Sequence, residues 1–279
     1  MTKYRIRDNV SRTYRFSRRY KSLVRGLYTA YTGMINEQKR LDTISNNLAN
    51  AATVGYKKEN VTSQAFEEAL TIKIKDSSEA YTNRPIGTMS LGVKLGEYYT
   101  DYAQGSFRET GNTYDLAIEG NGFFAVSTTD KNGNESIRYT RDGSFKMTQD
   151  GYIVDSYGNH LQGDGGDIQI PTNAQSVTID IDGTIYADKE YIGRVKLADF
   201  EDYNYLEKAG DNYYNAVDGA IQKDSVGIIR QGCTEQSNVN VISEMVNLIN
   251  ITRAYEAGQK VIKTQDQLLD QTVNQVGKV

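Results

Sequence analysis

The chain has 279 residues, of which 38% are hydrophobic, and its formal net charge is −4. One cysteine excludes an internal disulfide framework, and no apolar run approaches the roughly 20 residues that a membrane-spanning helix needs. We expect no cleaved secretory signal, because no apolar segment of that kind lies near the first residues. With 21 tyrosines, 25 glycines and two prolines, the composition favours strands joined by glycine turns.

Residues 1–22 form a basic segment. It contains eight Lys and Arg and a single acid, Asp8, a net charge of +7, so the rest of the chain carries −11. An acidic body argues against nucleic-acid binding, which needs a basic surface. The segment has no clear period, and we predict a disordered arm, with a tether to nucleic acid or anionic lipid as the alternative.

Residues 27–51 are predicted to form a helix. Apolar side chains recur every seven residues at Leu27, Met34, Leu41 and Leu48, with Ala30, Ile44 and Ala51 three residues further on. These are the a and d positions of a heptad repeat, interrupted by Glu37. An amphipathic pattern over residues 62–75 extends the predicted N-terminal helical stem to residues 23–75. Residues 76–105 are polar and are predicted to be a linker or loose strands.

Residues 106–230 are predicted to form an antiparallel β domain. Short segments with a period of two alternate with Asp-Gly and Asn-Gly pairs, which are strong hairpin signals. Gly120-Asn121-Gly122 begins a formal match to a dinucleotide-binding motif. Strand-like residues follow it where that motif needs a helix, so we interpret it as a hairpin turn.

Residues 231–279 are predicted to form a second helical stem. A strict seven-residue apolar repeat favours supercoiling against a partner helix. Its members, with a flanking residue that widens the face, are Val241, Met245, Leu248, Tyr255, Ile262, Leu269 and Val276. Gly258 interrupts the helix and costs roughly 1 kcal/mol relative to Ala. It either permits a close helix contact or is a tolerated exposed residue.

The predicted fold class is therefore α+β. Two heptad helices, one from each end of the chain, pair as a coiled-coil stem, and the antiparallel β domain lies between them in sequence. Apolar surface left on the helices would contact other subunits. The candidate assembly residues are Leu27, Met34, Leu41, Ile44, Leu48, Val241, Met245, Leu248, Tyr255, Ile262, Leu269 and Val276.

Residues suited to catalysis are few. His160 is the only histidine and lies in a predicted turn, and Cys233 has no histidine near it in the sequence. Asp164, Asp167, Asp180 and Asp182 could suggest calcium, but the closing Glu of a hand-type loop is missing. We therefore expect no enzyme activity, no cofactor and no metal.

Four motifs resemble those of the flagellar basal-body rod proteins, the FlgG/FlgF type of the rod–hook axial family. They run in the family's order through nearly all of residues 23–279. The motifs are RGLYTAYTGM at 25–34, SNNLANAATVGYKK at 45–58, TGNTYDLAIEGNGFFAV at 110–126 together with the segment at 139–163, and QGCTEQSNVNVISEMVNLINITRAYE at 231–256.

The resemblance implies a structural subunit of the rod, the shaft that transmits torque from the motor to the hook. It implies self-assembly into a helical polymer, contacts with other flagellar rod and hook proteins, and passage through the flagellar export apparatus without a cleaved signal peptide. It also implies a place in the basal body outside the cytoplasm, without membrane insertion or nucleic acid.

Alternatives remain at this stage. One is a short hook-type axial protein, and a less favoured one is a secreted glycan-binding or peptidoglycan-hydrolase β module. The basic arm has no counterpart in the family pattern, whose initiator Met would align with Leu23. We therefore expect residues 1–22 to come from an upstream choice of start codon.

Overall fold

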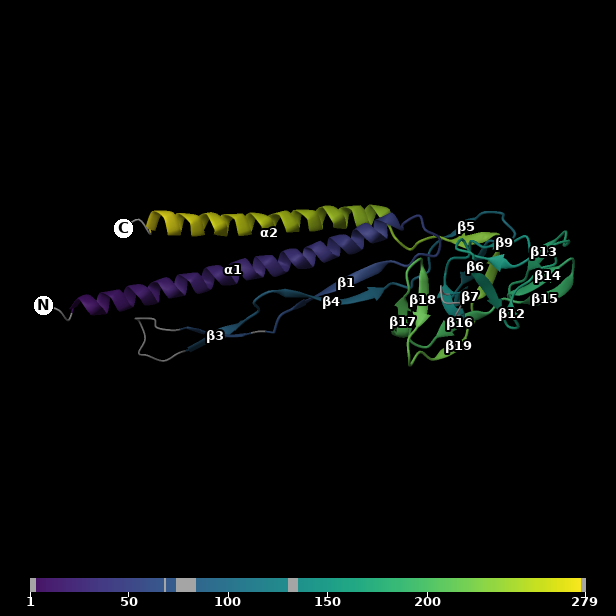
Figure 1. The fold of residues 1–279 in the computed structure, drawn as a ribbon, viewed down its shortest axis with the longest axis horizontal. Helices are drawn as coiled ribbons and strands as arrows, with labels where there is room; N and C mark the ends of the chain where they lie inside the picture. Colours follow the sequence, from purple (N-terminus) through teal and green to yellow (C-terminus); the bar gives the residue numbers. More distant parts are fainter. Residues whose placement is uncertain (1–3, 68, 74–83, 130–134, 277–279) are drawn as a thin grey trace. The chain divides into compact units, whose positions relative to one another are not determined.

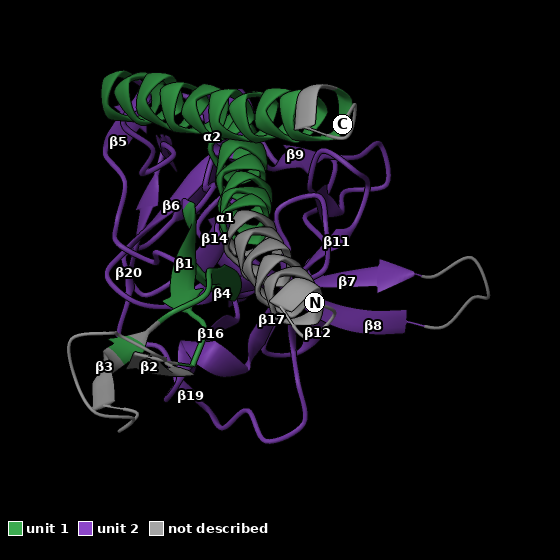
Figure 2. Cartoon of the chain, turned by 90° about the vertical axis from the view of Figure 1, so that its left-hand side faces the viewer, with its two compact units in different colours: residues 1–46, 59–99, 242–279 green, residues 47–58, 100–241 purple. Residues whose placement is uncertain are grey.

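Figure 1 shows the computed structural model, which describes the backbone of residues 4–67, 69–73, 84–129 and 135–276. Within these ranges, side chains are described except at residues 4–25, 69–87, 89, 275 and 276. The chain divides into two compact units, coloured in Figure 2. Unit 1 consists of residues 1–46, 59–99 and 242–279, and unit 2 of residues 47–58 and 100–241. Each unit is thus built from segments far apart in the sequence.

Unit 1 combines two long helices with two β ladders. The helices are α1 (Tyr4–Ala49) and α2 (Val241–Val276), and they run in opposite directions (Figure 1). The first ladder pairs β1 (Glu59–Ala65) with β4 (Val93–Thr100), and the second pairs β2 (Ala69–Lys73) with β3 (Arg84–Met89). Both predicted terminal helices are therefore present in the structure, but residues 231–240 of the predicted C-terminal helical stem are not helical, since β21 lies there and α2 begins at Val241.

Two boundaries in this region differ from the sequence prediction. The backbone of residues 4–22 continues α1 instead of forming a disordered arm, since it is contiguous with the heptad helix and rich in Arg, a good helix former. Residues 59–65 and 69–73 are not part of a helical stem: they form β1 and β2, which pair with strands inside the predicted linker. An apolar pattern this short fits either period, so pairing with β3 and β4 decides it.

Unit 2 is an antiparallel β domain, as the sequence predicts. Its elements are β5 (Phe107–Glu109), β6 (Leu116–Glu119), β7 (Phe123–Thr129), β8 (Glu135–Thr140), β9 (Lys146–Met147), β10 (Ile153–Val154), β11 (His160–Gly163), β12 (Gly166–Asp167), β13 (Val177–Ile179), β14 (Thr184–Ala187), β15 (Glu190–Arg194), β16 (Leu197–Phe200), the 3-10 turn η1 (Tyr203–Tyr205), β17 (Leu206–Lys208), β18 (Tyr213–Ala216), β19 (Gln222–Asp224), β20 (Ile228–Gln231) and β21 (Cys233–Glu235).

The main sheet of unit 2 has the order β17-β18-β8-β7-β11-β10-β9, to which β12, β16 and β19 add further pairs. Three smaller sheets accompany it: β13-β14-β15, β20-β6 and β21-β5. Because β6 pairs with β20, the turn at residues 120–122 links strands of two different sheets. It is a strand-to-strand turn, as expected, but not a hairpin.

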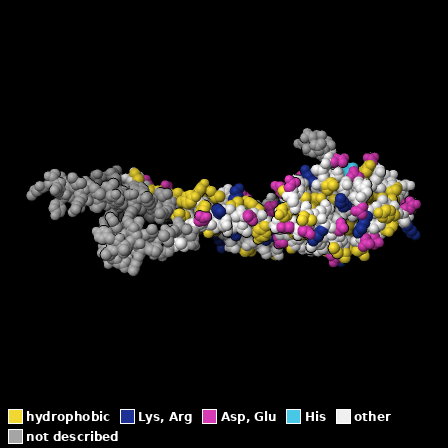
Figure 3. All heavy atoms as spheres, turned by 90° about the horizontal axis from the view of Figure 1, so that it is seen from below, with side chains coloured by type: hydrophobic (Ala, Val, Ile, Leu, Met, Phe, Trp, Pro, Cys, Tyr) yellow, Lys and Arg dark blue, Asp and Glu magenta, His cyan; other side chains and the backbone are white. Residues whose placement is uncertain are grey.

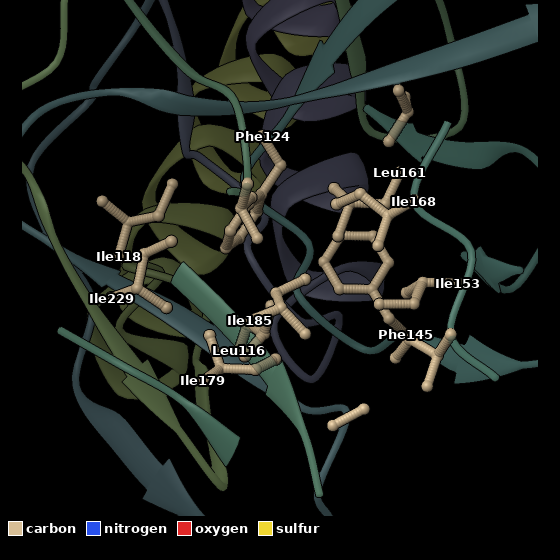
Figure 4. Close-up of a cluster of buried hydrophobic side chains, with 14 of the residues drawn as sticks. Leu116, Ile118, Phe124, Phe145, Ile153, Leu161, Ile168, Ile179, Ile185 and Ile229 are labelled. Carbon is tan, nitrogen blue, oxygen red and sulfur yellow. The ribbon is translucent and has the colours of Figure 1, made fainter. Parts of the chain in front are cut away.

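Strand β7 organises the core of unit 2, because it is buried on both faces. Phe124 and Val126 enter the larger apolar cluster, drawn in Figure 4, whereas Phe123 and Ala125 enter a second cluster with Tyr214. Alternate side chains of a strand point to opposite faces, so one strand serves both clusters. Unit 2 thus contains a closed apolar core made within one chain.

Candidate assembly surfaces

The fully buried line of α1 in the described residues is polar. It contains Thr32, Asn36 and Thr43, and the amide of Asn36 both donates to and accepts from the Ser63 hydroxyl of β1, at 2.9 and 3.2 Å. Thr29 donates to the carbonyl of Leu91, at 2.9 Å. Hydrogen bonds therefore hold this face of α1 against the β1–β4 segment. Apolar spacing in the sequence gives no signal for these polar residues.

The predicted apolar seam of α1 is only partly covered. Met34, Leu41, Ile44 and Leu48 are partly buried, and Leu27 is exposed. Beside it lie the exposed side chains of Tyr28, Tyr31 and Ile35. The structure thus leaves much of the apolar surface of α1 open to solvent.

The heptad register of α2 places Leu248, Tyr255, Ile262 and Leu269 on one partly buried line. Glu244, Ile251, Gly258, Gln265 and Thr272 alternate with them at intervals of three and four and are also wholly or partly buried. Val241 shares this register but is exposed, and Met245 is exposed and lies outside the register, whereas the side chain of Val276 lies outside the described residues.

A separate, uncovered apolar cluster lies near the start of α2. Ile242, Met245, Val246 and Ile249 are 77, 49, 52 and 49% exposed. Their spacing of i, i+3, i+4 and i+7 places them on one side of the helix. Ile242 and Val246 were missed from the sequence because they fall outside the seven-residue repeat. The spacing itself was the available signal.

Gly258 provides a close contact between the two helices. A Cβ added there would lie 2.6 Å from Met34 Cγ, so even alanine requires a shift. A second approach lies at Gly26, where an added Cβ would meet the side-chain amide of Gln265. The later residue of α1, Met34, thus meets the earlier residue of α2, Gly258, which is the order found in an antiparallel pair. Of the two roles considered for Gly258, the structure supports the close helix contact.

Unit 2 contains a buried ionic network where the chain enters and leaves it. Lys57 Nζ lies 2.5 Å from Glu235 Oε1, and Arg141 Nη1 lies 3.1 Å from Glu235 Oε2. The three side chains are only 1, 5 and 1% exposed for Lys57, Arg141 and Glu235. Burial lowers the pKa of Lys57, and the charge of Glu235 opposes that shift. The sequence carried no signal for this network, because its members are far apart in the chain.

The candidate chemical residues do not converge on a reactive site. His160 lies on β11, half exposed, with Nδ1 2.7 Å from Asp167 Oδ2 and its ring stacked on Tyr152. It is thus part of a surface pair and not the turn residue expected. Within the described ranges, no three His, Cys, Asp or Glu side chains are grouped to hold a metal ion. Within the same ranges, no helix combines the length and hydrophobicity that a membrane crossing needs.

The surface of unit 2 contrasts with the apolar cluster on α2. On the face drawn in Figure 3, acidic and basic side chains lie between the hydrophobic ones. Unpaired apolar side chains scattered singly are normal on a protein surface, whereas a contiguous set marks a contact site. The helices of unit 1 are therefore the better candidates for an assembly surface.

Three family models match the chain. The model of the flagella basal body rod protein matches residues 27–57, the flagellar hook protein FlgE/F/G D1 domain matches residues 117–187, and the flagellar basal body rod FlgEFG protein C-terminal model matches residues 230–276.

Curated relatives match along almost their whole length. The flagellar basal-body rod protein FlgG of Buchnera aphidicola subsp. Schizaphis graminum is 35% identical, over 88% of this chain and 98% of the relative. FlgG of Bacillus subtilis is 34% identical, over 90% and 99%. The flagellar basal-body rod protein FlgF of Caulobacter vibrioides is 35% identical, over 91% and 98%.

Proposed function

Because the chain belongs to the family of flagellar basal-body rod proteins and is a structural subunit of that rod, we propose that it joins its neighbours through the apolar faces of α1 and α2. The observation that carries this proposal is the exposed cluster of Ile242, Met245, Val246 and Ile249. Burying such side chains stabilises an interface by about 1.5–3 kcal/mol for each one fully covered.

The α1–α2 pair would form the stem of each subunit. The approaches at Gly258 and Gly26 and the partly buried line from Leu248 to Leu269 support antiparallel packing with a seven-residue period. In this arrangement the seam residues of α1, including Met34, Leu41 and Ile44, face α2. The apolar side chains on the outer sides of both helices then stay free for other subunits.

Assembly would produce a helical polymer. The exposed apolar residues of α1 and those of α2 form different surfaces, and a contact between different surfaces of identical subunits does not close into a dimer. Repeated contacts of this kind build a helical filament where their rotation does not close into a ring, and other rod and hook proteins with similar helices would continue it. Torque would pass from motor to hook because each subunit buries apolar area against several neighbours, so the shaft resists twisting collectively.

The basal body is the place of the assembled protein. We propose that the chain reaches it through the flagellar export apparatus without cleavage of a signal peptide and works outside the cytoplasm.

The test introduces a charge into the apolar cluster of the full chain. Ile249→Asp should abolish swimming and leave basal bodies without a complete rod, because a carboxylate cannot be buried in an apolar contact. Complementation of a deletion strain and electron microscopy of basal bodies measure this. Unit 2 should remain folded, which amide hydrogen exchange of β7 and β8 verifies.

A matched control lies two residues away. Asn247 is also exposed but lies on another side of α2, so Asn247→Asp should support normal swimming. Leu248→Asp places the same charge on the line facing α1 and should disrupt the helix pair itself. Normal rods with Ile249→Asp would show that the cluster is not an assembly surface.

A short hook-type protein is the second candidate, because the model that matches residues 117–187 is described as a hook-protein domain. Deletion separates the two roles. Loss of a rod subunit should leave basal bodies with a truncated rod, whereas loss of a hook subunit should leave a complete rod without a hook. The family is a structural one, and no relative reported above supports a glycan-binding or hydrolase module.

A further inference from the structure

Two buried cations of unit 2 share one carboxylate. Lys57 and Arg141 each form an ion pair with Glu235. The two contacts span 178 and 94 residues of sequence, respectively. Their other hydrogen-bond partners are neutral backbone carbonyls, and the nearby charge of Asp101 also favours the charged form of Lys57. Lys57 Nζ donates to Ala103 O at 2.9 Å, and Arg141 Nη2 donates to Gly120 O at 2.7 Å. Among the described contacts, Glu235 is therefore the carboxylate that ion-pairs with both cations.

The network reaches the core of unit 2. The guanidinium of Arg141 lies over the ring of Phe123, 5.4 Å from its centroid, and Phe123 is a member of the second apolar cluster. Arg141 directly follows β8 of the main sheet. Burial of this cation is thus coupled to the packing of β7 and β8. Loss of its counter-ion should therefore destabilise the main sheet.

Backbone N–H groups of earlier segments of unit 2 also donate hydrogen bonds to Glu235. The Gly55 N–H donates to Glu235 O at 2.7 Å, and Gly55 has a φ of 66°, which suits glycine. Gly105 N donates to Glu235 Oε1 at 2.9 Å. Residue 235 therefore meets segments that come from three earlier parts of the chain.

We propose that Glu235 makes the folding of unit 2 conditional on its C-terminal segment, because that segment brings the one carboxylate that ion-pairs with both Lys57 and Arg141 in the described residues. Removing one partner of a buried ion pair leaves an uncompensated buried charge, which is strongly destabilising. A chain synthesised from its N-terminus contains both cations long before residue 235. Until β21 joins, states that bury the sheet of unit 2 would be suppressed, so the β domain would fold as one piece with the end of the chain.

Native-state hydrogen exchange on the full chain tests the cooperativity directly. Amides of β21 and of its partner β5 should open in the same unfolding event as those of β7 and β8, with equal protection. An opening that releases β21 and β5 while β7 and β8 keep protection at least about 100-fold higher would overturn the proposal.

Variants test whether charge is the cause. Glu235→Gln keeps the shape and the acceptor for Gly105, and it should lower the folding equilibrium constant of unit 2 by about 100-fold or more. The exchange of β7 and β8 should accelerate by the same factor. The control, Glu119→Ala, removes a half-exposed pair with Arg230 and should change the constant by less than about fivefold.

A triple variant keeps the test decisive if Glu235→Gln does not fold. Lys57→Met, Arg141→Met and Glu235→Gln together remove all three charges while keeping similar volumes. Because a buried ionic group replaced by apolar side chains is often neutral or stabilising, the triple variant should regain a folded unit 2. If it is as unstable as Glu235→Gln, packing and not charge is responsible, and the proposal is wrong.

Discussion

Unit 2 buries a large apolar core, whereas α1 of unit 1 buries a line of polar side chains. Unit 2 encloses Phe124, Leu161 and Ile185 at 0% exposure, whereas the buried line of α1 in unit 1 is Thr32, Asn36 and Thr43. Unit 1 leaves large apolar side chains of both helices in solvent. A single chain thus completes the core of unit 2 but not that of unit 1. We propose that neighbouring subunits of the rod supply the missing cover for unit 1.

The largest expected effect concerns the core of unit 2. Phe124→Ala should destabilise this unit by about 3–5 kcal/mol, because it removes a fully buried ring from the cluster around β7. Urea unfolding followed by tyrosine fluorescence measures the free energy. The exposed Ile181→Ala should change it by no more than about 0.5 kcal/mol. Equal effects of the two substitutions would contradict the contrast between core and surface.

A smaller effect is expected at the close approach of the helices. Gly258→Leu should destabilise the α1–α2 pair by about 1–3 kcal/mol, because its side chain would collide with Met34. Thermal unfolding followed by helical circular dichroism measures this. The variant should lose its helical signal at a lower temperature than the unsubstituted chain. Gly258→Ala should be close to neutral, since the shift of Met34 offsets a gain of about 1 kcal/mol in helix propensity.

A second-site change sharpens that prediction. Met34→Ala removes the side chain with which a side chain added at position 258 would collide. It should therefore restore much of the stability lost in Gly258→Leu. Additive losses in the double variant would mean that these residues do not meet. Such a result would also argue against the proposed antiparallel pairing of α1 with α2.

The smallest effect is expected on the polar face of α1. Asn36→Ala should weaken the attachment of β1 by about 1 kcal/mol, because the hydroxyl of Ser63 loses its partner. Faster amide exchange in β1 and β4, with β7 unchanged, is the readout. Gln38, which is exposed on the same helix, provides the comparison, and Gln38→Ala should leave β1 and β4 unaffected.

Periodicity predicted the terminal helices and the β domain between them. A period of seven indicated the helices α1 and α2. It also indicated the partly buried line of α2 from Leu248 to Leu269. A period of two with glycine turns indicated the strands of unit 2. Both signals are local and depend on a few neighbouring side chains. The same reasoning was wrong over residues 59–65 and 69–73, where strand pairing overrides a short ambiguous pattern.

The sequence by itself therefore determined the class of each segment and, through its motifs, the family. Only the tertiary structure decided which face of α1 is buried, because a polar line such as Thr32 and Asn36 becomes internal only when β1 is placed against it. It also decided that Lys57, Arg141 and Glu235 form one network. Contacts across 94 and 178 residues leave no periodic trace in a sequence, and charge pairing acts only after folding has brought the partners together.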